Sequence, residues 1–190
     1  SLEHGKSVVT ANKEVISKHG PELMALASER GAHLLFEASV GGGIPIIGPL
    51  LRDLNGNNIT AIRSIINGTT NYILTNMTHK GSDFLATLGE AQALGYAESD
   101  PTNDVEGIDA AYKLSIMTSL AFKTKVYPTD IYREGISKLT SKDFRYAKEL
   151  GYVIKLMAIA KKEGRFVIKP GSSTFLFSSC NYFFIHLIVH

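Results

Sequence analysis

The segment from Glu98 to Lys113 has the residue types and spacing of a proton-transfer site. It holds five carboxylates and one lysine within sixteen residues, and the sequence then turns apolar. Asp109 and Lys113 lie four positions apart, so on a helix they would share one face. An acid and an amine on such a face could exchange a proton with a reacting group. Asp104 precedes the helical pattern and is predicted to be its N-cap.

The alternative is an ordinary ion pair on a solvated helix face. Such a pair contributes only about 0.2–0.5 kcal/mol and has no chemical role. Apolar residues flank the pair at Ile108, Ala111 and Leu114. We therefore expect Lys113 to be partly desolvated, which favours the chemical interpretation.

A glycine turn follows an expected buried strand over residues 33–39. Glu37 stands near the end of this strand, before Gly41, Gly42 and Gly43. The glycines do not have the GxGxxG spacing, so a phosphate-binding loop is only weakly supported. A carboxylate beside free backbone carbonyls could instead hold a hard cation. The alternative is a tight turn between a strand and a helix.

A second turn, Asn67-Gly68-Thr69-Thr70-Asn71, ends an expected strand over residues 59–66. It opens an expected helix over 69–79, where hydroxyls and free N–H groups are suited to a substrate carboxylate. The alternative is simply a capped helix start.

The remaining pattern predicts an α/β chain. A strand over 7–11, a helix over 21–30 and the strand over 33–39 indicate a parallel strand–helix–strand unit. Further helices are expected over 44–54, 83–94 and, weakly, 129–150. Strands are expected over 152–160 and 166–168, on either side of a turn at Glu163-Gly164.

Composition narrows the function classes. The 190 residues suffice for one domain with a sizeable core, or one and a half. The net charge of +2 shows no basic stripe, so no nucleic-acid partner is expected. Cys180 is the single cysteine, which excludes an internal disulfide and fits a reducing compartment. The apolar run 182–189 is about half a membrane span, so no membrane insertion is expected.

Four runs, in order, resemble the homoserine dehydrogenase family over about residues 5–165. They are Val8 to Lys13, Glu37 to Ile47, Asn67 to Ile73, and Gly95 to Lys113. The resemblance implies an enzyme that interconverts L-homoserine and L-aspartate 4-semialdehyde with NAD or NADP, in threonine, methionine and isoleucine biosynthesis. It also implies a homodimer, and a cytoplasmic location, or a plastid one in a plant.

The implied fold is the end of a Rossmann-type nucleotide-binding domain followed by a mixed-sheet α+β catalytic and dimerisation region. Residues 1–44 would be the remnant of the nucleotide-binding domain, 45–170 the catalytic and dimerisation region, and 171–190 an atypical tail.

The resemblance also implies roles for individual residues. Lys113 matches the catalytic lysine and Asp109 the acid one turn before it. The other matches comprise substrate-binding residues (Glu98, Asp104, Gly68, Thr69), cofactor-binding residues (Thr10, Asn12, Lys13) and a site for Na⁺ or K⁺ (Glu37, Val40, Gly42, Ile44).

The printed sequence departs from the family in two places. It lacks the glycine-rich nucleotide fingerprint, and the resemblance ends at Phe166. We therefore expect a fragment with negligible dehydrogenase activity alone. Two alternatives stay open: an inactive dimerising or substrate-binding module of the same fold, and an unrelated α/β enzyme that uses Lys113 as a Schiff-base lysine.

Overall fold

The computed structural model describes residues 1–163, 165–167, 177–178 and 187–189. These form two compact units, each described here by itself. The first unit comprises residues 1–60, 112–131 and the described part of 162–166; the second comprises 61–111, 132–161 and the described residues from 167 on. Within the described residues, no helix has the length and apolar character needed to cross a membrane.

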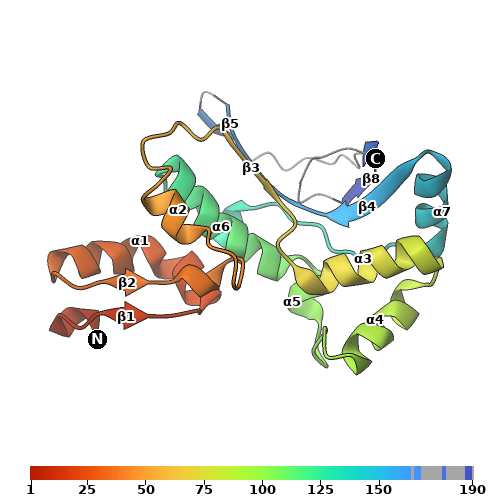
Figure 1. The fold of residues 1–190 in the computed structure, drawn as a ribbon, viewed down its shortest axis with the longest axis horizontal. Coiled ribbons are helices and arrows are strands. Elements are labelled where there is room, and N and C mark those ends of the chain that lie inside the picture. Colours follow the sequence, from red (N-terminus) through yellow and green to blue (C-terminus); the bar gives the residue numbers. More distant parts are fainter. Residues whose placement is uncertain (164, 168–176, 179–186, 190) are drawn as a thin grey trace. The chain divides into compact units, whose positions relative to one another are not determined.

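The first unit contains the predicted parallel strand–helix–strand motif. Strands β1 (Val8–Val9) and β2 (Leu34–Leu35) pair in parallel, with Val8 opposite Leu34, and helix α1 (Lys13–Glu29) connects them. Figure 1 shows α1 lying along the two strands. A short 3-10 turn, η1 (Leu2–His4), closes one end of this motif, and a small core links the helix to the strands (Leu2, Ala27, Ala32, with Val8, Leu23, Leu26, Leu34).

Helix α1 begins at Lys13, eight residues before the predicted start at Pro21. The side chain of Asn12 accepts a hydrogen bond from the backbone N–H of Val15 at 3.0 Å, which caps the helix. Ile16 is buried, so the earlier turns also have an apolar anchor. The cap and this burial outweigh the cost of a proline inside the helix.

Three other elements of the first unit are short. The predicted strand 33–39 ends at Leu35, because the chain turns at buried Phe36 into the 3-10 turn η2 (Glu37–Ser39). Helix α2 (Ile47–Leu51) is shorter than the predicted 44–54. A further 3-10 turn, η3, spans Pro128–Asp130.

The second unit is built on helix α3 (Gly68–Lys80). It packs against helices α4 (Phe84–Ala93) and α7 (Ser141–Glu149) and strand β4 (Tyr152–Leu156). These four elements are grouped together in Figure 1. Their shared core is closely packed (Ile73, Leu74, Met77, Ala91, Phe144, Ile154, Leu156).

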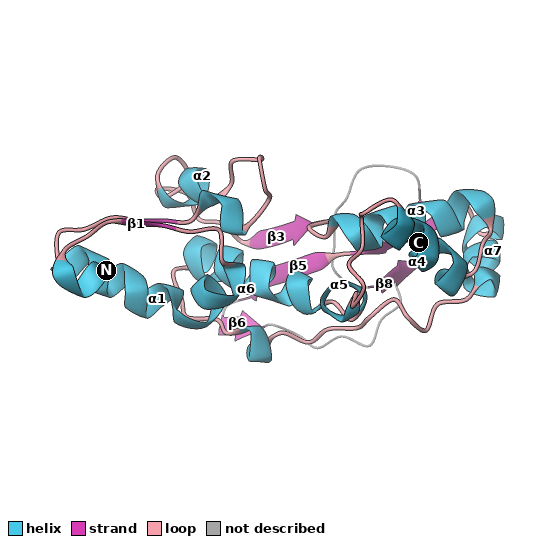
Figure 2. Ribbon diagram, turned by 90° about the horizontal axis from the view of Figure 1, so that it is seen from below, coloured by secondary structure: helices cyan, strands magenta, loops and turns pink. Residues whose placement is uncertain are grey.

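The strands β3 to β8 form two three-stranded sheets. One has the order β3 (Ala61–Ser64), β5 (Ala158–Glu163), β6 (Arg165–Val167), and the other has the order β7 (Phe177–Ser178), β4, β8 (Leu187–Val189). Strand β3 pairs antiparallel with β5, as Figure 2 shows, and β4 pairs antiparallel with β7 and β8.

The predicted helix after Asp104 is two helices, α5 (Thr102–Val105) and α6 (Ile108–Phe122). Asp104 therefore lies inside α5, and its prediction as an N-cap is wrong. Asp100 instead accepts hydrogen bonds from the backbone N–H and the hydroxyl of Thr102. The break between the helices is at Gly107, whose φ of 73° is a conformation that glycine adopts without strain.

Two C-terminal predictions are also corrected. The expected strand 152–160 is divided at Met157 into β4 and β5, and helix in the 129–150 stretch is confined to η3 and α7. Strands β5 and β6 lie on either side of the predicted turn and are neighbours in their sheet. Of the apolar run 182–189 only β8 is described, and Cys180 lies outside the described residues.

Candidate functional site

Asn67 joins two of the three predicted acidic residues of the second unit. It stands between β3 and α3, and its side-chain N–H₂ donates to Asp104 at 2.6 Å and to Asp109 at 2.9 Å. Its carbonyl oxygen accepts from the backbone N–H of Thr70 at 2.8 Å, which caps α3. One buried amide thus serves as a helix cap and as the donor to two carboxylates from α5 and α6.

This arrangement decides against a solvated helix face for Asp109. Its side chain is only 3% exposed, and a carboxylate at that depth needs hydrogen-bond donors to remain charged. Lys113 follows one turn later on the continuous helix α6 and is half-buried, as predicted. α6 begins in the second unit and continues into the first. It carries a buried acid and a partly buried amine at helical spacing.

The first turn of α3 also holds the loop that carries Glu98. The hydroxyl of Thr69 donates to the backbone carbonyl of Tyr96 at 2.7 Å, and the rings of Tyr72 and Tyr96 lie 4.7 Å apart. Glu98 itself is exposed. Gly68, at the first position of α3, is exposed as well. The predicted substrate residues therefore gather around the start of one helix.

Lys155 is a polar residue of this region that the sequence interpretation missed. It lies on β4, and its ammonium donates to the side-chain oxygens of Asn71 at 2.8 Å and Thr75 at 2.6 Å. Asn67, Asn71 and Thr75 follow one another at four-residue intervals, so they line one face of α3. Burial lowers the pKa of Lys155 below its ordinary value. Its signal was a lone lysine within an apolar strand.

The pKa of Lys155 predicts how stability changes with pH. Because the folded chain disfavours the charged amine, it loses the proton at a lower pH than the unfolded chain does. Stability therefore rises with pH from the folded-state pKa up to the ordinary value of 10.5. The free energy of unfolding of the parent, minus that of Lys155→Met, is expected to increase over this alkaline range in urea titrations. A difference that stays flat over this range would contradict the assignment.

The three predicted cofactor residues of the first unit lie at the start of α1. The hydroxyl of Thr10 accepts from the backbone N–H of Asn12 at 3.0 Å, and the Asn12 side chain is the N-cap. Lys13 is the first residue of the helix. Thr10 and Asn12 thus have structural roles in the turn that presents Lys13.

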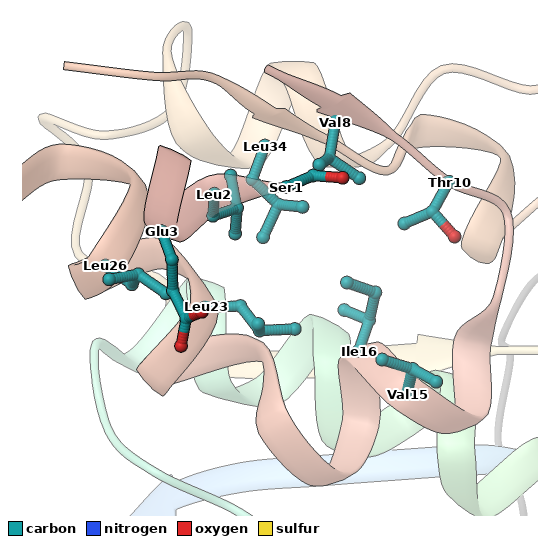
Figure 3. Close-up of a pocket in the computed structure, with 10 residues that line it drawn as sticks. All are labelled: Ser1, Leu2, Glu3, Val8, Thr10, Val15, Ile16, Leu23, Leu26 and Leu34. Atoms are coloured by element: carbon teal, nitrogen blue, oxygen red, sulfur yellow. The ribbon is translucent and has the colours of Figure 1, made fainter. Parts of the chain in front are cut away.

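A cavity of about 350 Å³ opens beside this turn in the first unit. Figure 3 shows Val8 and Leu34 from the strands facing Ile16 and Leu23 from α1 across it. The lining is mostly apolar, with Thr10 at one end. Such a surface suits apolar groups, and it offers few donors for phosphate.

Glu37 is committed to the start of α2. Its carboxylate accepts from the backbone N–H groups of Ile46, Ile47 and Gly48 at 2.5, 2.8 and 2.7 Å. Burial by itself would raise the pKa of Glu37, but these N–H groups together with Arg52 outweigh it and hold the pKa below its ordinary value. The negative charge therefore already has its partners within the fold.

The predicted cation site must then rely on backbone oxygens. Val40, Gly42 and Ile44 lie in an irregular turn between η2 and α2. Val40 is buried, Ile44 is exposed, and Gly42 has a φ of 59°. Within the described part of the chain, no group of three or more His, Cys, Asp or Glu side chains could hold a metal ion.

Fold and site together define an α/β protein in which a buried amide at a helix start holds one buried and one partly buried carboxylate, and comparison with known proteins agrees. The family model for homoserine dehydrogenase matches residues 45–182. The homoserine dehydrogenase of Neisseria gonorrhoeae is 52% identical over 165 residues, covering 87% of this chain and 38% of that protein. The enzyme of Pseudomonas aeruginosa is 53% identical over 162 residues, covering 85% and 37%.

Solved structures give the same result. A homoserine dehydrogenase from Thiobacillus denitrificans superposes with a TM-score of 0.82 at 52% identity, over 85% of this chain and 38% of that one. A hyperthermophilic archaeal homoserine dehydrogenase in complex with NADPH gives 0.73 at 33% identity, over 94% and 53%. The chain belongs to the homoserine dehydrogenase family, whose members are NAD(P)-dependent oxidoreductases.

Family membership confirms the resemblance and excludes the unrelated Schiff-base enzyme. The match runs to residue 182, so the expectation that it ends at Phe166 is corrected. The chain spans 37–38% of the length of these two curated relatives.

Proposed function

We propose that this chain carries the substrate-binding and catalytic part of a homoserine dehydrogenase. The supporting observation is the Asn67 amide that joins Asp104 to buried Asp109, with Lys113 one turn further along α6. The substrate class is a small amino acid with an aldehyde or alcohol at the far end of its side chain.

The predicted site residues would bind the charged groups of the substrate and donate a proton to it. L-Aspartate 4-semialdehyde carries an ammonium group that Glu98 and Asp104 would bind, and a carboxylate suited to the N–H groups of Gly68 and Thr69 at the start of α3. NAD(P)H, when bound, supplies the hydride to the aldehyde carbon. Lys113 gives its proton to the aldehyde oxygen as negative charge develops there, which yields the alcohol of homoserine.

The first unit would hold the cofactor and a cation. Lys13 lies at the positive end of the α1 dipole, so charge and position both favour a negatively charged cofactor, NAD or NADP. Thr10 and Asn12 fix the turn beside it. The carbonyls of Val40, Gly42 and Ile44, which follow Glu37 in the chain, are the proposed ligands for Na⁺ or K⁺.

Glu98→Gln tests the substrate role. The change removes the charge that meets the ammonium group, so the KM for homoserine is expected to rise about tenfold or more, with the KM for NAD(P) nearly unchanged. Steady-state kinetics in a full-length homoserine dehydrogenase that carries this segment would measure both constants. Equal losses for both ligands would point to a structural role for Glu98 instead.

The proposal includes a homodimer. The second unit leaves large apolar side chains exposed on and beside α4 and α7, at Leu85, Leu94, Tyr146 and Leu150. Exposed apolar surface of this kind is typical of protein interfaces. Sedimentation at micromolar concentration is expected to give twice the chain mass, and a stable monomer would contradict the dimer.

The cytoplasmic location stays a prediction.

A dimerising or substrate-binding module without catalysis is the second candidate. The exposed apolar side chains on and beside α4 and α7 would serve such a module equally well, because docking through them needs no cofactor. Titration with NADPH separates the two candidates, because only the dehydrogenase requires cofactor binding.

A further inference from the structure

The side chain of Gln92 holds the backbone of Glu98. The Gln92 amide nitrogen donates to the carbonyl of Glu98 at 3.0 Å and to the carbonyl of Ser99 at 3.3 Å. Earlier loop residues return to α4 through the backbone, since Tyr96 and Ala97 both donate to Ala91. Among the described residues, Gln92 supplies the hydrogen bonds made to Glu98 and Ser99.

Gln92 attaches the loop that carries Glu98 to a packed helix. It lies in the last turn of α4, directly after Ala91, which is fully buried in the core that α4 shares with α3. Thr69 and the Tyr72–Tyr96 ring pair hold the other end of the same loop against α3. Both ends of the loop therefore attach to packed helices.

The Glu98 backbone is hydrogen-bonded, but among the described residues its side chain is not. Its carboxylate is exposed, and it makes no hydrogen bond or ion pair within the described part of the chain. A fixed backbone that carries an uncommitted carboxylate binds a cation with less loss of loop entropy than a mobile backbone would. We infer that Gln92 is a positioning residue: it fixes the backbone from which Glu98 binds the substrate ammonium group. This inference rests on the proposed function.

The chemistry of an amide suits this task. Its N–H₂ group has two donors, and both neighbouring carbonyls are acceptors. Gln92→Glu keeps the size of the side chain but turns an acceptor toward two carbonyl oxygens, which would release the loop. Gln92→Ala removes the donors without adding charge, and it serves should the charged variant fold poorly.

The test is a double-mutant cycle in a full-length homoserine dehydrogenase that carries this segment. Gln92→Glu is expected to raise the KM for homoserine about tenfold, and Gln92→Ala several-fold, with the KM for NAD(P) and the melting temperature nearly unchanged. In a Glu98→Gln background the same changes should add less than about twofold, because the side chain that Gln92 positions has already lost its charge.

Asn76→Asp is the matched control. Asn76 also donates its amide to a backbone carbonyl, that of Tyr72 at 3.0 Å, but within α3. Its change to an acid should leave the KM for homoserine unaltered. Equal effects of Gln92→Glu in both backgrounds would overturn the inference, as would a loss of stability without a change in KM. If Glu98→Gln alone leaves the KM unchanged, the proposed substrate role of Glu98 fails, whatever Gln92 does.

Discussion

Lys113→Ala is expected to lower kcat by about 10²–10⁴-fold, the usual loss when a general acid is removed. Half-buried Lys113 lies one turn after buried Asp109 on α6, and in the proposed mechanism its ammonium is the proton donor. Steady-state rates in both directions, in a full-length homoserine dehydrogenase that carries this segment, would measure the loss. Circular dichroism should show an intact fold.

A charge-preserving variant separates proton donation from electrostatics. Lys113→Arg keeps the positive charge, but a guanidinium does not release its proton at working pH, so kcat should stay low. Lys125→Ala removes an exposed lysine that pairs with Glu22 and should leave kcat unaltered. A Lys113→Ala enzyme with nearly normal kcat would refute the assignment.

Asn67→Asp is expected to destabilise the second unit by about 3 kcal/mol or more at neutral pH. The change replaces the donor to Asp104 and Asp109 with a third carboxylate, and hydrogen bonds to charged groups contribute about 1.5–3 kcal/mol each. The capping oxygen toward Thr70 is retained, so the loss reports the acidic cluster and not the helix start. Urea unfolding measures it.

The pH dependence of this variant gives an independent check. Crowded carboxylates share protons, so the introduced carboxyl group would have a raised pKa in the folded chain. A raised folded-state pKa means that the folded chain binds more protons, and the variant should therefore recover stability as pH falls toward about 5. Asn67→Ser removes the donor without adding charge and should show little recovery. An Asn67→Asp variant as stable as the parent at pH 7 would show that Asn67 does not bridge the two acids.

Local signals predicted the elements whose ends are set by nearby residues. Asn67 and Gly81 bound α3 within one residue of the prediction, and the parallel pairing of β1 with β2 follows from strand, helix and strand in sequence. The start of α1 differs from the prediction because proline is a common signal for a helix start, whereas the cap is Asn12 and Pro21 lies inside the helix. The break at Gly107 was missed because a single glycine does not reveal the packing that requires it.

In the candidate site, too, local features were predictable and contacts between distant residues were not. The spacing of Asp109 and Lys113 is visible along the chain, and their helix is observed. The bridge from Asn67 to Asp109 joins residues 42 positions apart, and the contact of Lys155 with Asn71 spans 84. No local pattern encodes such distances, so the roles of Asn67 and Lys155 emerged only from the folded chain.

The pairing of β3 with β5 has a consequence for synthesis. Ala61 lies opposite Lys161, so β3 leaves the ribosome about 100 residues before its partner, a delay of roughly 5–20 s at ordinary translation rates. During this interval the strand lacks its partner and has an open edge, with which neighbouring nascent chains can pair. Co-translational chaperones would therefore be needed most between the emergence of residue 61 and that of residue 161.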